Sequence, residues 1–440
     1  MDRADAALQA AVRLPTIANA DPTTIDPAPF DALHEVLRTH FPQLHQRLDL
    51  TPIDRHGLLF HWQGRSAERP VVLMAHLDVV PVDESAPWQH PAFSADVVDG
   101  AMWGRGTLDD KGCLVAICEA VERLLESDFV PAQDIWLSFG ADEEVSGRCA
   151  PAAVEELRTR GVRPWFVIDE GGAIAGQAFP GVLPPVGVVG VTEKGTTTLT
   201  LTADGRGGHA STPARNGPTV RIARAILRIE KAPFAARLPA PTIELLRRLA
   251  PHAPKALGAV MANAGRLRPG VTRALIAAGP EPAAMTRTTV AVTTLSGAPA
   301  ANVIASSARA GLNVRVMVGD SVDGVVRHIR KAMRDTGIRI DVEDANEPSP
   351  VSPWVGDAAY DLIETTIAEI FPDAIPSPYV MMAATDSRFF TAICERVYRF
   401  APFRMSKEQR GSIHSYDEHL RLDDFHSGIV WYRRLLEKVA

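Results

Sequence analysis

Strand-like and helix-like segments alternate through the first 170 residues, and this alternation limits the folds open to the chain more than any other feature. Residues 71–77 form an almost wholly apolar run, which suits a strand in a sheet that is covered on both faces. The expected elements are the helices 5–13, 29–39, 111–126 and 151–160 and the strands 58–62, 71–77, 135–140 and 165–168. Their order predicts an α/β fold with a mostly parallel sheet.

The pattern changes near residue 190, where a different architecture begins. Its expected elements follow the order β-α-β-β-α-β, at 194–203, 219–230, 288–295, 309–318, 322–336 and 339–343. This order predicts an α+β sandwich with its helices on one face.

The length of the chain and the return of helix–strand alternation near its end predict two domains, one inserted into the other. A chain of 440 residues exceeds what one core usually holds, and helix–strand alternation resumes from Asp357. We therefore expect one domain in two parts, residues 1–190 and 346–440, with an inserted domain at 191–345. An Ala/Pro-rich stretch near 232–287 contains helical pieces that the sequence does not place.

Composition excludes several functional classes. The net charge of -7 gives no reason to expect nucleic acid as a partner. The four cysteines show no CxxC pairing, which fits reduced thiols in a reducing compartment. We see no signal-peptide pattern and no apolar run near the roughly 20 residues that span a bilayer. We therefore expect a soluble, cytoplasmic protein with no membrane partner.

Side chains that can bind metal stand where the expected strands end. His76 and Asp78 follow the apolar strand at i and i+2, so they lie on the same side of an extended chain. His76 could bind a metal while Asp78 fixes its ring, or His76 could simply be a strand-end histidine held by a local carboxylate. Asp109 precedes the helix 111–126, where it, or its neighbour Asp110, could instead be an N-cap.

Further carboxylates follow the next strands. Glu143 and Glu144 come after 135–140, and such neighbours repel unless cations or protons compensate; the alternative is an exposed acidic loop. Asp169 and Glu170 follow 165–168, and His414 precedes the last expected helix. Since the carboxyl ends of parallel strands share one edge of a sheet, these groups predict a metal site there. One histidine per ion with bridging and terminal carboxylates suits two Zn²⁺ ions, and Mn²⁺ or Co²⁺ would accept the same donors.

Four ordered motifs resemble those of a known family. They are His76-Leu-Asp78-Val-Val-Pro, Gly104-Arg-Gly-Thr-Leu-Asp109-Asp110-Lys-Gly, Asp142-Glu143-Glu144-Val-Ser-Gly and Asp169-Glu170-Gly-Gly. Together they resemble the dinuclear zinc aminoacylase/carboxypeptidase family, and most of all its carboxypeptidase S and Xaa-carboxypeptidase branch. The resemblance implies a zinc-peptidase-like catalytic domain with an inserted lid and dimerisation domain.

The resemblance also implies roles for individual residues. Glu143 would be the general base, and Asp78 would orient His76. Asp109 would bridge both ions and precede a cis peptide bond to Asp110, and Asp169 competes with Glu170 for one position. The implied zinc ligands are His76, Asp109, Glu144, Glu170 and His414. His419 and His426 are more typical of surface or helix positions.

The expected inserted domain carries further matches. Gly208-His209-Ala-Ser-Thr-Pro resembles the family's lid histidine, which polarises the scissile carbonyl and in many members reaches into the partner's site. The segment around Asn302 resembles an Asn-Val-Ile-Pro turn, with Ala305 in place of proline. Arg315 stands where carboxypeptidase members bind the substrate carboxylate, although a solvated strand charge is the alternative. A homodimer joined through the inserted domains is implied.

These features predict hydrolysis of an N-acyl amino acid or short peptide at an amide bond next to a free carboxylate. Glu143 would pass a proton from water to the leaving nitrogen. A deacylase of a biosynthetic intermediate, of the acetylornithine or succinyl-diaminopimelate type, shares nearly the same motifs. A non-catalytic relative is disfavoured because Glu143 and all five expected ligands are present. A nucleotide-binding enzyme is excluded, since no GxGxxG links a strand to a helix.

Overall fold

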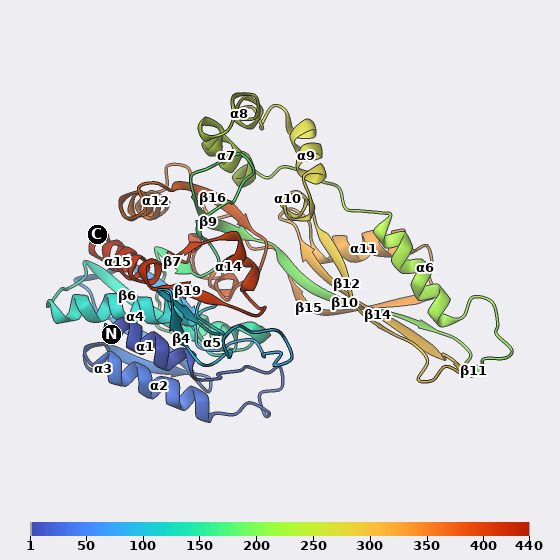
Figure 1. Cartoon of the computed structure of the whole chain (residues 1–440), viewed down its shortest axis with the longest axis horizontal. Coiled ribbons are helices and arrows are strands. Elements are labelled where there is room, and N and C mark those ends of the chain that lie inside the picture. Colours follow the sequence, from blue (N-terminus) through green and yellow to red (C-terminus); the bar gives the residue numbers. More distant parts are fainter. Residues whose placement is uncertain (1, 440) are drawn as a thin grey trace.

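The computed structural model describes residues 2–439, and its largest element is a ten-stranded mixed sheet (Figure 1). The strand order is β1 (Asp49–Ile53), β2 (Gly57–Trp62), β6 (Gln133–Gly140), β3 (Ser66–His76), β7 (Phe166–Asp169), β17 (Val397–Arg399), β9 (Val186–Glu193), β8 (Ala173–Ala175) and β18 (Arg404–Met405), with β16 (Ile375–Met381) paired to β9. The four neighbouring strands β6, β3, β7 and β17 are parallel. Antiparallel pairs occur toward both edges, so the expected parallel arrangement describes the centre of the sheet.

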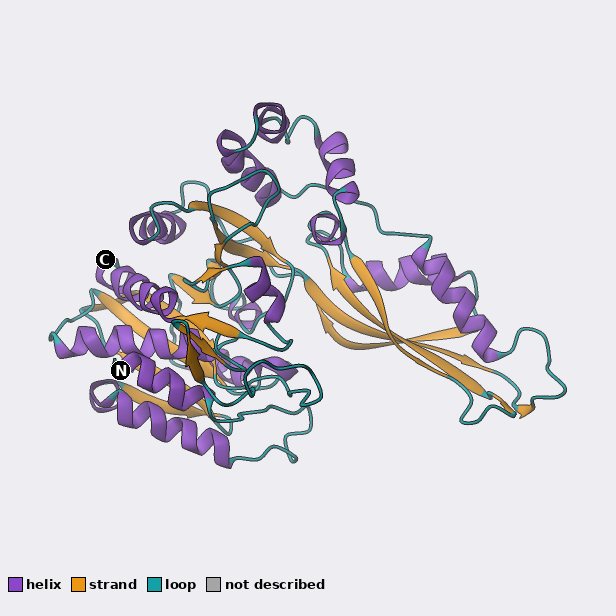
Figure 2. Ribbon diagram, in the orientation of Figure 1, coloured by secondary structure: helices purple, strands orange, loops and turns teal. Residues whose placement is uncertain are grey.

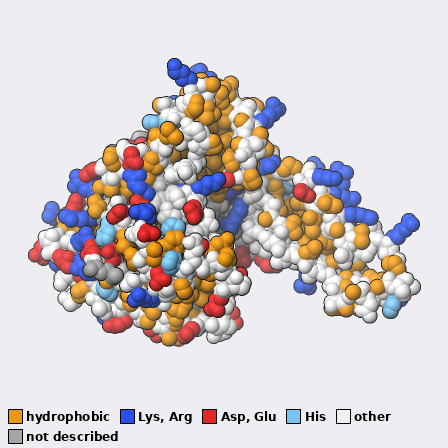
Figure 3. All heavy atoms as spheres, viewed as in Figure 1, with side chains coloured by type: hydrophobic (Ala, Val, Ile, Leu, Met, Phe, Trp, Pro, Cys, Tyr) orange, Lys and Arg blue, Asp and Glu red, His pale blue; other side chains and the backbone are white. Residues whose placement is uncertain are grey.

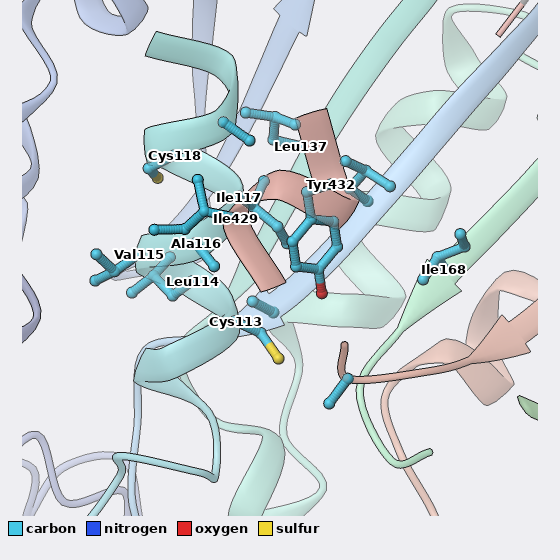
Figure 4. Packing of buried hydrophobic residues seen from close by; sticks show 14 of the residues in the cluster. Cys113, Leu114, Val115, Ala116, Ile117, Cys118, Leu137, Ile168, Ile429 and Tyr432 are labelled. Atoms are coloured by element: carbon cyan, nitrogen blue, oxygen red, sulfur yellow. The ribbon is translucent and has the colours of Figure 1, made fainter. Parts of the chain in front are cut away.

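Helices cover both faces of this sheet, which explains why its central strands are apolar. One face packs against α1 (Arg3–Val12), α2 (Ala28–His40), α3 (Pro42–Arg47), α4 (Lys111–Glu126), α12 (Ala358–Ile370) and α15 (Leu422–Lys438). The other packs against α5 (Cys149–Thr159) and α13 (Ser387–Phe390). Figure 4 shows side chains of α4 packed against Ile429 and Tyr432 of α15 beside the strands of the sheet.

A second, four-stranded antiparallel sheet stands apart from the first (Figure 2). Its order is β12 (Thr289–Ser296), β14 (Ser307–Val316), β10 (Gly195–Asp204) and β15 (Ile338–Asn346). Helices α6 (Pro218–Glu230) and α11 (Val322–Met333) bury one of its faces. The chain order of these six elements is the expected β-α-β-β-α-β. The boundaries 1–190, 191–345 and 346–440 stay predictions.

The Ala/Pro-rich stretch that the sequence left unplaced forms a small group of helices. They are α7 (Ala240–Leu249), the 3₁₀ turn η2 (Ala250–His252), α8 (Lys255–Ala262), α9 (Arg268–Ala277) and α10 (Pro280–Ala284). Leu245, Leu246 and Leu249 of α7 share a core cluster with Val186 of β9. These helices therefore pack on the large sheet, although they lie within the range 191–345 expected for the inserted domain.

Short elements complete the described chain. They are the three-stranded sheet β4 (Asp96–Val98), β5 (Ala101–Trp103) and β19 (His419–Arg421), the pair β11 (Gly208–His209) and β13 (Val303–Ile304), the 3₁₀ turn η1 (Glu143–Val145) and α14 (Lys407–Ser412). All four cysteines are buried and free. Among residues 2–439, no helix combines the length and apolarity that crossing a bilayer requires.

Candidate metal centre

The carboxyl ends of three neighbouring strands supply most of the expected site. β3 ends at His76, β7 ends at Asp169, and η1 begins three residues after β6 ends, with Glu143. His76 is in register with Gly140, the last residue of β6. Parallel pairing therefore brings residues far apart in the sequence to one edge of the sheet. His414 reaches the same place from the loop after α14.

Five side chains converge there in two groups that share Asp109. Nε2 of His76 lies 2.9 Å from Oδ1 of Asp109 and 3.6 Å from Oε1 of Glu170. Nε2 of His414 lies 2.9 Å from Oδ2 of Asp109 and 3.1 Å from Oε2 of Glu144. Each carboxylate oxygen of Asp109 thus belongs to a different histidine–carboxylate group. This is the arrangement that a carboxylate bridging two cations requires.

The charge of the group also fits bound cations. Burial raises the pKa of Glu144 and raises that of Glu170 well above its usual value. Although burial opposes it, contacts with His414 and His76 hold the pKa of Asp109 below its ordinary range. Asp109 and Glu144 in turn raise the pKa of His414 to about 10.

Within residues 2–439, no Lys or Arg forms an ion pair with the three carboxylates Asp109, Glu144 and Glu170. Oε1 of Glu144 is buried without a hydrogen-bond partner in the same part of the chain. Clustered buried carboxylates are costly unless cations compensate. Two imidazoles and three carboxylates therefore form a donor set that suits a pair of divalent transition-metal ions.

Asp78 has more contacts than the sequence suggested. Its Oδ1 lies 3.5 Å from Nδ1 of His76, whose ring nitrogen is 3.0 Å from the main-chain oxygen of Asp78. Its two carboxylate oxygens also accept hydrogen bonds from the backbone N–H groups of Glu143 and Glu144, at 3.2 and 3.1 Å. Asp78 is fully buried, so it fixes the η1 turn as well as the surroundings of the His76 ring.

Glu143 belongs to neither metal-capable group, although it borders the same cavity. Burial raises its pKa well above the usual value. Its carboxylate has no hydrogen bond or ion pair with any other described side chain. Glu143 is therefore free to act on a molecule in the cavity.

In each of two pairs of adjacent acidic residues, the structure places only one residue in a metal-capable group. Glu170 joins the group around His76, whereas Oδ2 of Asp169 accepts a hydrogen bond from Ser387 N at 2.9 Å. The peptide bond between Asp109 and Asp110 is cis, as the resemblance implied. Asp110 directly precedes α4 but makes no side-chain capping hydrogen bond there; its Oδ2 accepts a hydrogen bond from His76 N at 3.3 Å.

Glu418 supports the site, and sequence reasoning gave it no role. It is fully buried, and its Oε1 accepts hydrogen bonds from the backbone N–H groups of Leu108 and Asp109 at 2.8 and 3.2 Å. Its Oε2 pairs with Arg105 at 2.6 Å. Nothing in its local pattern distinguishes it from an exposed loop acid. His419 stacks on Trp103, and His426 of α15 pairs with Asp5, so neither joins the metal-capable groups.

The expected lid residues lie elsewhere in this chain. His209 is exposed in β11, at the far tip of the four-stranded sheet (Figure 1), and its Nδ1 lies 2.7 Å from Oγ of Ser211. Asn302 is exposed beside it, and its main-chain oxygen accepts a hydrogen bond from Ala210 N. The structure thus brings His209 and Asn302 together, but not to the metal-capable groups of the same chain.

Arg315 lies in β14, between Thr196 of β10 and Thr289 of β12. It is half-buried, and burial lowers its pKa. Across residues 2–439 its guanidinium has no ion pair or side-chain hydrogen bond, so it is available to an anion. Figure 3 shows a hollow between the two parts of the molecule, with basic side chains along it.

A cavity of about 450 Å³ opens on the metal-capable groups. Asp109, Glu144, Glu170 and His414 border one part of it. Most of the remaining wall is apolar and comes from β8, β9, β16 and α7. A cavity of this size with a few convergent polar groups is typical of a small-molecule site.

Comparison with known proteins agrees with this geometry. A model of the peptidase family M20/M25/M40 matches residues 72–438. The "Probable carboxypeptidase S-like 2" of Dictyostelium discoideum is 33% identical over 93% of this chain and 79% of its own length. The "N-fatty-acyl-amino acid synthase/hydrolase PM20D1" of Xenopus tropicalis is 31% identical over 98% of this chain and 85% of its own.

A solved structure shares the fold. The M20 family metallo-carboxypeptidase Sso-CP2 of Sulfolobus solfataricus superposes with a TM-score of 0.72 over 99% of both chains, at 17% identity. The match to the family model, the two relatives and the convergent metal-capable side chains lead to one assignment. This chain belongs to the peptidase family M20/M25/M40, a family of metal-dependent hydrolases that cleave amide bonds.

Proposed function

We propose that the protein is a dinuclear zinc hydrolase that cleaves N-acyl amino acids or short peptides at the amide bond next to a free carboxylate. The observation that carries this proposal is the placement of the two Asp109 oxygens, each 2.9 Å from a different histidine. In the proposed centre, His76 and Glu170 would hold one ion, His414 and Glu144 would hold the other, and Asp109 would contribute to both. When bound, two such cations polarise the scissile carbonyl and lower the pKa of water. Mn²⁺ and Co²⁺ suit the same donors.

Glu143 is the proposed general base. It borders the cavity beside the proposed ligand Glu144, and its backbone is held by Asp78. Its carboxylate takes a proton from the attacking water and delivers it to the leaving nitrogen. A base free of other side-chain partners can make both transfers.

Three residues of the four-stranded part complete the proposal. Arg315, unpaired and half-buried, grips the carboxylate of the leaving amino acid in a bidentate fork. His209 polarises the carbonyl and Asn302 contacts the substrate; both lie at a remote tip, and in this proposal they act in the site of a second chain. The protein is therefore proposed to be a homodimer joined through its four-stranded parts.

The chemistry of the cavity favours an apolar acyl group over a charged one. The carboxylate-binding candidate Arg315 belongs to the four-stranded sheet, whereas the apolar cavity belongs to the large sheet. An N-acyl amino acid bound across the metals would place its acyl group in this cavity. The frog relative is described as acting on N-fatty-acyl amino acids, which agrees with such a substrate.

Hydrolysis of a panel of substrates tests the proposal. The panel contains N-acyl amino acids, dipeptides, acetylornithine and succinyl-diaminopimelate, each assayed after loading with Zn²⁺, Mn²⁺ or Co²⁺. We expect two metal ions per chain and the highest kcat/KM with an apolar N-acyl amino acid. Activity confined to acetylornithine or succinyl-diaminopimelate would establish the rival deacylase instead, and one ion per chain would refute the dinuclear centre.

A further inference from the structure

The cavity beside the metal centre is lined on one side by strands of the large sheet. Its floor begins at Glu170 and Gly171 and continues along β8 to Ala175, where β9 lies alongside at Val186. Ala175 lies four positions beyond Gly171 in the chain, so the floor extends for up to roughly 14 Å. The side chains along it are mainly small, which leaves room for a narrow ligand; they include Ala173, Ala175 and Ala178.

Residues of α7 and the end of α10 line the cavity at the Val186 end of this floor and form its end wall. Leu245 and Leu249 lie four residues apart on α7, so they project from the same face of the helix, and both border the cavity. Met285, directly after α10, borders it as well. This wall comes entirely from the Ala/Pro-rich stretch that packs on the large sheet rather than on the four-stranded one.

Away from the metal centre, three polar side chains within residues 2–439 border the cavity: Tyr379, Glu281 and Arg410. Arg410 is half-buried and donates hydrogen bonds from Nη1 to the main-chain oxygens of Gly176 and Met405. Glu281 is exposed. Apart from these side chains, Glu143 and the metal-capable groups, the described residues that line the cavity are apolar or glycine, so an unbranched hydrocarbon chain meets mainly apolar walls.

We propose that the helical stretch α7–α10 sets the maximum length of acyl chain that this enzyme binds, with Leu245 and Leu249 as the residues that limit it. The proposal rests on the proposed function, since it assigns the acyl side of the substrate to this cavity. It adds a specificity-determining element that the metal-binding motifs do not contain. A straight acyl chain enters beside Glu170, extends along β8 and stops against α7.

A chain-length series measures this limit. Each methylene group buried in an apolar cavity strengthens binding about fourfold. With N-acylglycines from acetyl to palmitoyl, we expect kcat/KM to rise about fourfold per methylene and then level off where the chain meets α7. Leu249→Trp narrows the cavity and should move that break to shorter chains. Leu249→Ala widens it and should move the break to longer chains.

Leu246→Ala is the matched control. Leu246 lies on the same helix and is buried to 1% exposure, yet it does not border the cavity. The substitution removes the same side-chain atoms and comparable packing, so a general loss of stability affects both alanine variants. Only Leu249→Ala should change the chain-length profile.

Binding separates this inference from the proposed function. The same series is titrated calorimetrically into metal-loaded Glu143→Gln protein, with and without the substitutions at Leu249. If the wild type hydrolyses no N-acylglycine but the dissociation constants still depend on chain length and change with the Leu249 substitutions, the limit set by α7 is supported and the proposed function fails. If acyl substrates are hydrolysed while kcat/KM levels off at the same chain length in both Leu249 variants as in the wild type, α7 does not limit the chain length. A flat binding series also overturns the proposed limit.

Discussion

Asp109 has contacts on both sides that together fix its carboxylate. In front, its two oxygens face different histidines, and behind it the buried carboxylate of Glu418 accepts a hydrogen bond from its backbone N–H. Arg105 balances the charge of Glu418 at 2.6 Å. Groups with no metal-binding role therefore position the residue that joins the two halves of the centre, in the way that outer hydrogen bonds orient metal ligands generally.

Glu143→Gln separates catalysis from metal binding. Glutamine keeps the shape of the side chain but cannot take a proton from water. We expect kcat to fall by about 10²-fold or more while two metal ions per chain remain. Metal content by atomic absorption and kcat of the loaded variant measure the two effects. Loss of metal would show that Glu143 is a ligand, and retained activity would show that another group is the base.

Asp386 makes the free energy of unfolding depend on pH. Burial raises its pKa to about 8, with Asp169 and Asp78 contributing, and Oδ1 has no hydrogen-bond partner within residues 2–439. The folded state therefore holds a proton that the unfolded state releases near pH 4, so stability falls as pH rises from about 4 to about 8.

Asp386→Asn removes this pH dependence, so the variant should gain stability relative to the wild type as pH rises through the same window. Urea unfolding at pH 5 and pH 8.5 measures the difference. It should be made on metal-free protein, because bound cations would lower the pKa of nearby acids. A difference between the two proteins that is the same at both pH values would contradict the expectation.

At the scale of helices and strands, the sequence predicted the elements that border the metal centre. The helix expected at 111–126 is α4 with the same bounds, because apolar residues recur along its whole length and the glycine-rich turn before it marks its start. The strand expected at 71–77 became β3, which extends back to Ser66 where the chain is polar and partly exposed. Three of the five converging side chains stand at or just after the ends of apolar strands of the sheet, whereas Asp109 and His414 reach the same edge from loops.

The helices α7–α10 could not be placed from the sequence for a physical reason. Three of these helices carry proline in their first turn, where proline is tolerated. The helices are also short, so each shows too few turns for a clear helical pattern of apolar residues; they are Ala240–Leu249, Arg268–Ala277 and Pro280–Ala284. The strand on which α7 mainly packs is β16, which the chain reaches only after it has completed the four-stranded sheet. Glu418 escaped notice for a related reason, since its burial depends on contacts with Leu108 and Arg105 rather than on any local pattern.

The packing of α7 on the large sheet predicts an unequal response to truncation within this stretch. Leu246→Ala should lower the free energy of unfolding by about 2–5 kcal/mol, because a buried leucine leaves a cavity. Val260→Ala, on α8, should change it by less than about 0.5 kcal/mol, because that side chain is 41% exposed. Denaturant unfolding of both variants provides the comparison. Equal effects would mean that α7 is not held on the sheet.

At the scale of the whole molecule, His209 lies far from the metal-capable groups of its own chain, so a rearrangement or a second chain must bring a histidine to the site. In the single chain, His209 lies at the exposed tip of the four-stranded sheet (Figure 1). Either the four-stranded part closes onto its own large sheet, or the tip enters the site of a second chain. The two alternatives predict opposite results when two inactive variants are mixed.

Glu143→Gln and His209→Ala chains, each inactive alone, test the choice when they exchange subunits. If His209 acts across the dimer, one site of each mixed dimer combines wild-type Glu143 with wild-type His209. Random assembly of equal amounts makes half of the dimers mixed, so activity should recover to about a quarter of the wild-type value. Exchange is verified independently by fluorescence transfer between labelled chains. Recovery that follows the exchange rate supports action across the dimer. Complete exchange without recovery would place His209 in the site of its own chain, because closure within one chain leaves every site of every mixed dimer lacking either the base or the histidine.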